Sequence, residues 1–342
     1  MGKVQERRDE LTMKKPFKLI ITSVAAAFVL AACQAPAPAT APPEASTDAD
    51  QVTEVADEEV VRIGFSLAER DQWLTYLEIA ATERAAELGV ELTVFDAQRD
   101  INQQLSHIQS FAAQGFDAII VNVVDPAFTD AMIMDASGTP VVFVNRMPAE
   151  HVLEENFVAF VGSDEGAAGE LQAEFLTEYF ADHDGPVNYV MLLGLIGHPG
   201  TTARTAAFRE SMEAAGFDLN TVFEQTANFD RAEAMDIMQQ FLGTGQHFDV
   251  VVSNNDEMAL GAIEAMRAVG IDDIPVVGID ASPHGVASIA AGEMAASPFQ
   301  NPVGQGAGAV DKALSAAMGQ GFPMITWIPF ELVTAENVAD YQ

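Results

Sequence analysis

Short apolar runs alternate with segments of helical periodicity from residue 60 to the C-terminus. The apolar runs are nearly continuous, which is typical of strands in a parallel sheet covered by helices on both faces. The intervening segments are amphipathic, and several end at a glycine, which suits the left-handed end of a helix. The predicted strands are residues 60–67, 91–96, 118–123, 141–144, 188–193, 222–226, 250–253, 275–279 and 294–299, and the predicted helices are 72–88, 101–114, 167–181, 201–215, 232–243, 257–268 and 303–319.

The alternation restarts after the apolar run at residues 158–162, so the chain contains two successive βα series. Two such series predict two similar lobes. We therefore expect an α/β fold with two Rossmann-like lobes, each built on a doubly wound parallel sheet. Ligands of open α/β sheets bind beyond the carboxyl ends of the strands, and with two lobes facing each other those ends meet in one cleft.

Polar and aromatic side chains follow the predicted strands, where the cleft is expected. Turns favour Asn, Asp and Gly, but arginines and bulky aromatics in these loops are unusual. A sugar hydroxyl both donates and accepts hydrogen bonds, so a mixture of carboxylates, amides and guanidinium groups suits it, while flat aromatics stack on the ring. The residues at these positions are 70–73, Asn122, 145–146, His198, Arg204, 228–230, 254–256, Asp280 and 299–301.

The sequence gives less support for an enzyme active site, a nucleotide-binding loop or a metal site. At any single position the alternative is a turn former or helix cap, and we expect Asp230, Asp256 and Ser163 to be N-caps. No Ser–His–acid constellation is visible, so no enzyme activity is expected. The glycine-rich segments 194–200 and 304–308 lack the Lys-Ser/Thr of a nucleotide P-loop, and the scattered histidines do not predict a zinc site. We expect neither a cofactor nor a metal.

The N-terminal segment predicts export and lipid anchoring. A basic stretch at residues 14–18 precedes an apolar run too short to span a bilayer, so residues 1–32 are predicted to be a signal peptide, with Met13 as the favoured start. Its Leu-Ala-Ala-Cys ending resembles the bacterial lipobox, whose cysteine is diacylated after cleavage. Cys33 is the only cysteine, which excludes an internal disulfide. Residues 33–59, rich in Ala, Pro, Thr, Ser and acids, predict a flexible tether.

Charge restricts the partners. The chain has 16 basic and 51 acidic residues, a formal net charge of −35. Six of the basic and three of the acidic residues precede Cys33, which leaves 10 basic against 48 acidic residues after the predicted cleavage. Nucleic acid and anionic lipid are therefore poor partners, and any membrane association would come from the lipid anchor.

From residue 60 onward the chain resembles the periplasmic sugar-binding proteins of the ribose and glucose/galactose type. The resemblance rests on segments 121–126, 197–199 with Arg204, 253–259 and 277–281, which occur in the right order. It implies a substrate-binding lipoprotein of an ABC importer that closes around its ligand by hinge motion. The hinge crossings are expected near residues 161–163, 299–301 and 327–329, with an N-terminal lobe of residues 60–161 and 300–327 and a C-terminal lobe of 162–299 and 328–342.

The resemblance also implies individual ligand contacts. Arg146 and Gln300 match the ribose type, although Asn145 stands where that type has an aspartate. His198 matches the glucose/galactose type, but Gly200 stands where that type has an acid. The expected ligand is a ribose-like pentose, a hexose or a cyclic polyol. The remaining matches are Asp71 in a polar role, Trp73 and Phe229 as stacking aromatics, and Asn122, Arg204, Asn255 and Asp280 as hydroxyl contacts.

Cellular context follows from the same resemblance. Residues 182–186 are too short for the calcium loop of the glucose type, so no structural calcium is expected. We expect a monomer in the periplasm or on the outer face of the cytoplasmic membrane, anchored through Cys33, that delivers its ligand to an ABC permease. A sugar-sensing role beside a chemoreceptor or sensor kinase is the alternative. A sugar-responsive repressor would need a DNA-binding segment and a basic surface, which this acidic chain lacks.

Overall fold

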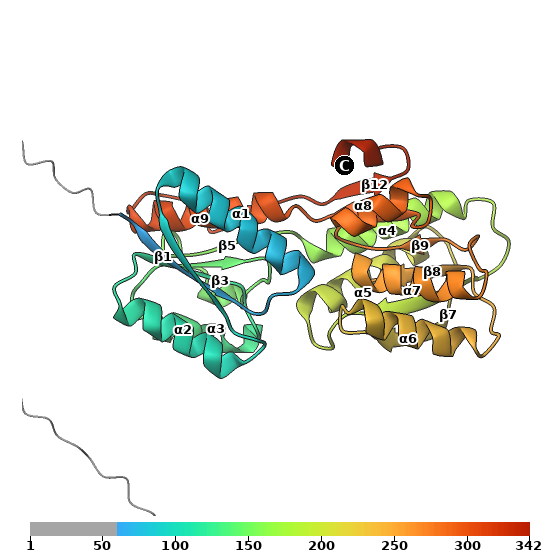
Figure 1. Ribbon diagram of the computed structural model, residues 1–342, viewed down its shortest axis with the longest axis horizontal. Helices are drawn as coiled ribbons and strands as arrows, with labels where there is room; N and C mark the ends of the chain where they lie inside the picture. The colour runs from blue at the N-terminus through green and yellow to red at the C-terminus, as the bar shows by residue number, and fades with distance from the viewer. Residues whose placement is uncertain (1–59) are drawn as a thin grey trace, which may run out of the picture. The chain divides into compact units, whose positions relative to one another are not determined.

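The computed structural model describes residues 60–342, which form two six-stranded sheets flanked by helices (Figure 1). The predicted signal peptide, Cys33 and the tether lie outside the described residues. Within the described residues, no helix has the length and apolar character needed to cross a membrane. The predicted α/β fold with two doubly wound lobes is confirmed.

The first sheet is entirely parallel, in the order β11-β5-β4-β3-β1-β2. Successive strand residues point to opposite faces. Ile120 and Val142 therefore pack with α1 and α9, whereas Ile119 and Phe143 pack with α2 and α3. The elements are β1 (Arg62–Leu67), α1 (Gln72–Leu88), β2 (Glu91–Asp96), α2 (Ile101–Ala113), β3 (Ala118–Val121), α3 (Thr129–Asp135), β4 (Val141–Val144), β5 (Val158–Gly162), α9 (Pro302–Ala317) and β11 (Ile325–Trp327), with short 3₁₀ turns η1 (Pro126–Phe128) and η2 (Glu150–Val152).

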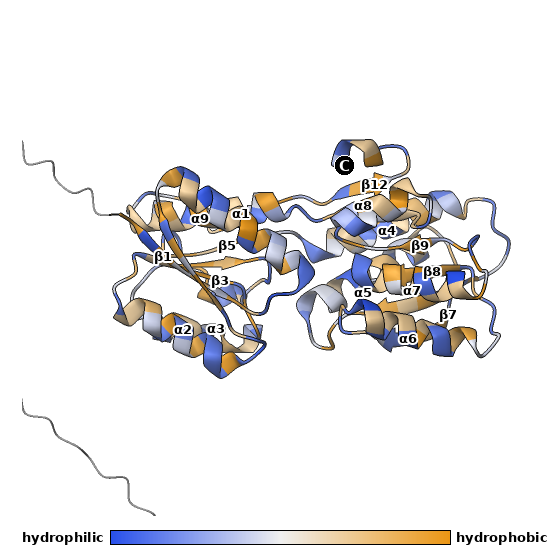
Figure 2. Ribbon diagram, in the orientation of Figure 1, coloured by the Kyte–Doolittle hydropathy of each residue, from blue (hydrophilic) through white to orange (hydrophobic). Residues whose placement is uncertain are grey.

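The second sheet has the order β12-β10-β9-β8-β6-β7 and is parallel except for β12, which pairs antiparallel with β10. Helices α4 and α5 cover one face, and α6, α7 and α8 cover the other. Figure 2 shows hydrophobic residues concentrated along the strands of both sheets. The elements are α4 (Glu165–Tyr179), β6 (Val187–Leu193), α5 (Pro199–Ala214), β7 (Leu219–Thr226), α6 (Arg231–Leu242), β8 (Val250–Ser253), α7 (Asp256–Ala268), β9 (Val276–Val277), α8 (Pro283–Ala290), β10 (Ala296–Phe299), β12 (Glu331–Thr334) and the 3₁₀ turn η3 (Val338–Tyr341).

The chain passes between the two sheets three times. It leaves the first sheet after β5 and enters α4, which packs against β10 and β12. It returns after β10 into α9, which packs against β3, β4 and β5. It crosses a third time between β11 and β12.

Several local predictions are confirmed and others are wrong. The glycines expected at helix ends, including Gly89 and Gly216, have positive φ of 69° and 94°. Asp230 caps α6 as expected, but α4 is capped by Asp164 and α7 by Asn255. Each of these two caps lies one residue from the expected position, and α4 starts two residues and α7 one residue earlier than predicted. The sequence pattern also missed α3, α8, β11 and β12, which are too short to show a clear period.

Candidate functional site

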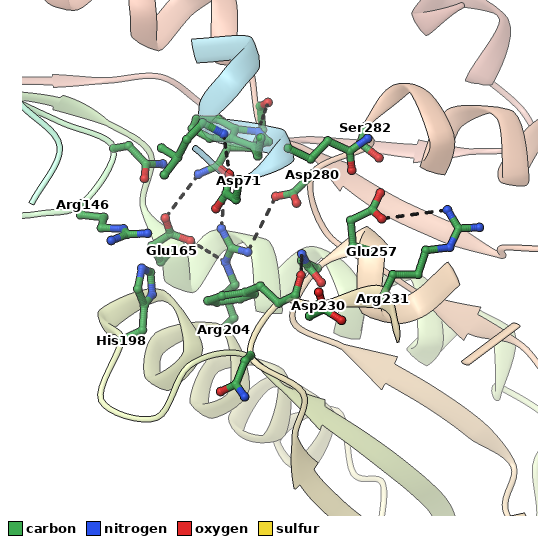
Figure 3. Close-up of a pocket in the computed structure, with 18 of the residues that line it drawn as sticks. Asp71, Arg146, Glu165, His198, Arg204, Asp230, Arg231, Glu257, Asp280 and Ser282 are labelled. Carbon is green, nitrogen blue, oxygen red and sulfur yellow. Dashed lines mark hydrogen bonds and ion pairs between the residues drawn. The ribbon is translucent and has the colours of Figure 1, made fainter. Parts of the chain in front are cut away.

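A cavity of about 300 Å³ lies at the carboxyl ends of the strands and is lined from both lobes (Figure 3). Ten of the eleven candidate residues line it; Asn122 is the exception. Asn122 is fully buried, and its side chain accepts from the Ala68 amide and donates to the Val144 carbonyl. It therefore braces the loops that follow the strands, and the structure does not bring it to the cavity wall with the other candidates. Nowhere in residues 60–342 do three or more His, Cys, Asp or Glu side chains cluster as metal ligands.

One wall of the cavity comes from the loops of the first sheet. Arg146 is 8% exposed, donates Nη2 to Oε1 of Glu69 at 2.9 Å, and donates Nη1 to the Val123 carbonyl at 3.1 Å. Glu69 also pairs with Arg99. Because Arg146 and Arg99 both pair with the buried Glu69 carboxylate, their guanidinium groups are held in position to donate hydrogen bonds to a ligand.

Asp71 adds an acceptor to the same wall. It is the N-cap of α1, and its Oδ1 accepts from the Leu74 amide at 2.7 Å. Burial raises the pKa of Asp71, although Leu74 and Arg146 act in the opposite direction. Next to it, the Trp73 indole donates to the Gln300 carbonyl at 3.3 Å, which ties α1 to the segment between β10 and α9.

Arg204 on α5 is the centre of the opposite wall. It is 6% exposed, donates Nε to Glu165 at 2.6 Å and Nη1 to the Asn254 carbonyl at 2.7 Å, and has Asp280 at 3.8 Å. Burial by itself would lower the pKa of Arg204, but Glu165 and Asp280 raise it above its ordinary value. The guanidinium is therefore charged at every relevant pH.

Asp280 follows β9 and is almost fully buried. Burial raises the pKa of Asp280 well above its ordinary value; Arg204 opposes this, while Asp256 and Asp71 add to it. Asp256 lies behind it at the start of α7 and accepts from the Ser282 amide and the Ser297 hydroxyl. A ligand hydroxyl that donates to Asp280 would therefore add to the compensation that Arg204 gives for the burial of this carboxylate.

His198 and Phe229 form an aromatic corner of the cavity. His198 caps α5, and its Nδ1 accepts from the Gly200 amide at 3.1 Å, which leaves Nε2 as the protonated nitrogen. Burial, with Arg146 and Arg204 nearby, lowers the pKa of His198 to about 2, so the imidazole is neutral. The Phe229 ring meets it edge-on at 5.3 Å between centroids, and a Cβ at Gly194 would lie 2.1 Å from that ring.

Sequence reasoning missed five charged residues of the cavity, which are Arg99, Glu165, Asp230, Arg231 and Glu257. A signal for Arg99 exists. The segments 97–100 (Ala-Gln-Arg-Asp) and 227–230 (Ala-Asn-Phe-Asp) both have two residues of positive φ before an aspartate N-cap. Arg99 thus occupies in one lobe the position that Phe229 occupies in the other. Glu165 gives no local signal, because only the packing of α4 on α5 brings it to Arg204.

A second cavity of about 500 Å³ shares Trp73, Asp280, Ser282 and Gln300 with the first and is otherwise mainly apolar. Its walls include Ile79, Val286 and Val303. A polyhydroxylated ligand would lose its hydrogen bonds to water there without replacing them. The smaller, polar cavity is therefore the candidate site.

Two α/β lobes whose strand ends enclose a polar cavity define a two-lobe solute receptor of the binding-protein class. A family model described as a periplasmic binding protein domain matches residues 63–321, and the chain belongs to this family.

Relatives and solved structures agree with this assignment. The "Putative rhizopine-binding protein" of Rhizobium meliloti is 39% identical over 289 residues, covering 82% of this chain and 92% of its own length. An ABC transporter solute-binding protein of Bacillus halodurans with bound myo-inositol is 38% identical with a TM-score of 0.77, covering 84% of this chain and 98% of its own. The Caulobacter myo-inositol binding protein is 28% identical with a TM-score of 0.73, covering 82% and 95%. These relatives are binding proteins, and the chain is a binding protein and not an enzyme.

Proposed function

We propose that the chain captures a monosaccharide or cyclic polyol in the 300 Å³ cavity and delivers it to an ABC permease. The observation that carries the proposal is the convergence, from both lobes, of fixed acceptors such as Asp280, fixed donors such as Arg204 and flat aromatics on one small space. Such a set serves hydroxyls that donate and accept at once. Because two similar solved structures hold myo-inositol, a cyclic polyol is the first ligand to test.

In the proposed function, the two lobes close around the ligand by a hinge motion. The lobes are residues 60–161 with 300–327 and residues 162–299 with 328–342. Three separate crossings between the sheets support a hinge there, since short connecting segments absorb such rotations. A closed, ligand-bound form is the species that a permease, or alternatively a chemoreceptor, would recognise.

The Asp280→Asn variant tests the cavity assignment. Replacing one carboxylate oxygen by an NH₂ donor removes a strong acceptor, so affinity for the polyol should fall roughly tenfold or more by calorimetry. Asp311→Asn is the matched control, because Asp311 is exposed on α9, pairs only with Arg84 and does not line the cavity. Equal affinity of Asp280→Asn and wild type for myo-inositol, D-ribose and D-galactose would show that these ligands do not bind here.

Lipid anchoring through Cys33 is part of the proposal and rests on the Leu-Ala-Ala-Cys sequence. The expected location is the periplasm or the outer face of the cytoplasmic membrane. In a bacterial host, the wild-type protein should fractionate with membranes and carry a diacylglyceryl mass on its first residue. Cys33→Ser should appear in the soluble fraction without that mass, and a membrane-bound Cys33→Ser variant would contradict the anchor.

A further inference from the structure

Position 200 on α5 has no side chain, and the space that a side chain would enter is bordered by the His198 ring and by a carboxylate from another helix. A Cβ added at Gly200 would lie 3.1 Å from Nδ1 of His198 and 3.3 Å from Oε2 of Glu165, at the start of α4. Helices α4 and α5 approach closely, since a Cβ at Gly169 would lie 2.2 Å from the Arg204 carbonyl oxygen. This close packing brings the first turn of α4 against the first turns of α5.

The Glu165 carboxylate is partly committed to protein partners and partly available. Its Oε2 accepts from Nε of Arg204 at 2.6 Å, and its Oε1 accepts from Nε2 of Gln300 at 3.3 Å. Each carboxylate oxygen has two acceptor sites, so each retains one. The side chain is 15% exposed and lines the cavity. Figure 3 shows it beside Arg204, on the side of the cavity where His198 and Arg146 also lie.

Arg204 therefore stands between two carboxylates. Glu165 pairs with its Nε edge, and Asp280 lies 3.8 Å from its Nη1. A guanidinium flanked by two acceptors matches two neighbouring hydroxyls, because each hydroxyl then donates to one carboxylate and accepts from the shared arginine. This arrangement favours a vicinal diol on a ring.

We propose that Glu165 is a specificity-determining residue that accepts a hydrogen bond from one hydroxyl of such a diol, beside the space that the missing side chain at position 200 leaves open. The inference rests on the proposed function and assigns part of the same cavity. It predicts that the acceptor can be moved from α4 to α5 without losing the ligand.

The experiment compares Glu165→Ala, Gly200→Asp and the double variant by calorimetry with myo-inositol and, as a second probe, D-galactose. Glu165→Ala should lower affinity roughly 10- to 100-fold, since it removes a charged acceptor. Gly200→Asp alone should also lower affinity, because its carboxylate competes with Glu165 for the same space. In the Glu165→Ala background, the same Gly200→Asp change should raise affinity at least several-fold.

Glu224→Ala is the matched control. Glu224 pairs with Arg209, which is also on α5, but neither residue lines the cavity, so affinity should remain at the wild-type value. Urea unfolding without ligand confirms that each variant is folded. Wild-type affinity in Glu165→Ala, or a Gly200→Asp change that harms binding equally in both backgrounds, would overturn the role of Glu165 while leaving the proposed function intact. Failure of the wild-type protein to bind any polyol or sugar would overturn both.

Discussion

Backbone strain at the residue scale is concentrated around the cavity. Five lining residues other than glycine have positive φ: Arg99, Asn145, Asn228, Phe229 and Asp280. This conformation costs about 1–2 kcal/mol for a residue with a Cβ, and such strain persists where the surrounding structure enforces it. The strained residues direct their side chains from the strand ends toward the ligand space.

Asp256 makes a prediction about stability and pH. Burial raises the pKa of Asp256 to about 7, against the lowering effect of the hydrogen bonds from Ser297 and Ser282. Between about pH 4 and 7 the folded protein keeps a proton that the unfolded chain has released, so this residue's contribution to the free energy of unfolding falls as pH rises and is constant above pH 7. Asp256→Asn removes this titration.

Urea unfolding from pH 4.5 to 8 measures the effect. The wild-type protein should lose unfolding free energy, relative to Asp256→Asn, as pH rises to 7. Asp249→Asn is a useful comparison, because the pKa of Asp249 is lowered overall: burial raises it, but hydrogen bonds from Asn188 outweigh that. Relative to Asp249→Asn, the wild-type protein should therefore show no loss of unfolding free energy toward pH 7. Identical pH dependence in wild type and Asp256→Asn would contradict the prediction.

Close helix pairing through glycine is the main feature at the element scale. A Cβ would lie 2.2 Å from the Arg204 carbonyl oxygen at Gly169, 2.2 Å from the Arg231 carbonyl oxygen at Gly261, and 2.5 Å from the Leu77 carbonyl oxygen at Gly306. These glycines join α4 to α5, α7 to α6 and α9 to α1. Each pair brings polar side chains near the helix starts within reach of the cavity.

Gly169→Ala should therefore affect both stability and binding. The added methyl group forces α4 and α5 apart, which should lower the free energy of unfolding by about 1–3 kcal/mol. Because α5 carries Arg204, affinity for the ligand should fall as well. Gly306→Ala, at the equivalent contact of α9 with α1, should cost similar stability with a smaller effect on affinity. Urea unfolding and calorimetry measure the two quantities, and a Gly169→Ala variant with wild-type affinity would contradict the link between this helix pair and the site.

The excess of acidic over basic residues is the dominant property at the scale of the whole molecule. The chain carries a net charge of −35, yet each of the nine arginines within residues 60–342 has a carboxylate within 4.0 Å. Lys312 instead donates to the Pro323 carbonyl and the Thr326 hydroxyl. Most acidic side chains in this described part of the chain therefore have no basic partner, and their mutual repulsion opposes the compact state.

Added salt should stabilise the folded protein. Raising NaCl from 10 to 150 mM shortens the Debye length from about 30 Å to about 8 Å and screens repulsion between exposed carboxylates. The urea midpoint at pH 7 should therefore move upward with salt, and should move less at pH 4.5, where part of the carboxylates are protonated. A midpoint that falls with salt at pH 7 would show that attraction within the ion pairs outweighs the repulsion.

The pattern of apolar and polar residues along the chain predicts most of the secondary structure of this protein. Nearly continuous apolar runs separated by helical segments determined the two βα series, because buried parallel strands and their covering helices need those periods wherever they occur. The rule that ligands bind at the carboxyl ends of strands identified the loops, and the resemblance to sugar-binding proteins selected eleven candidates within them, ten of which line the cavity. Sequence position alone could not distinguish Asn122, whose side chain bonds to the backbone, from the neighbouring candidates whose side chains line the cavity.

Only the tertiary structure decided the charge pairing within the cavity. Glu165 meets Arg204 across 39 positions of sequence, and Glu69 meets Arg146 across 77. Such pairs depend on how closely α4 packs on α5 and how the strand-end loops converge, and no periodicity along the chain records those distances. The sequence by itself determined two lobes and the rim that faces the ligand; three-dimensional packing decided which carboxylate serves which arginine, because an ion pair depends on a few ångströms that only the folded chain defines.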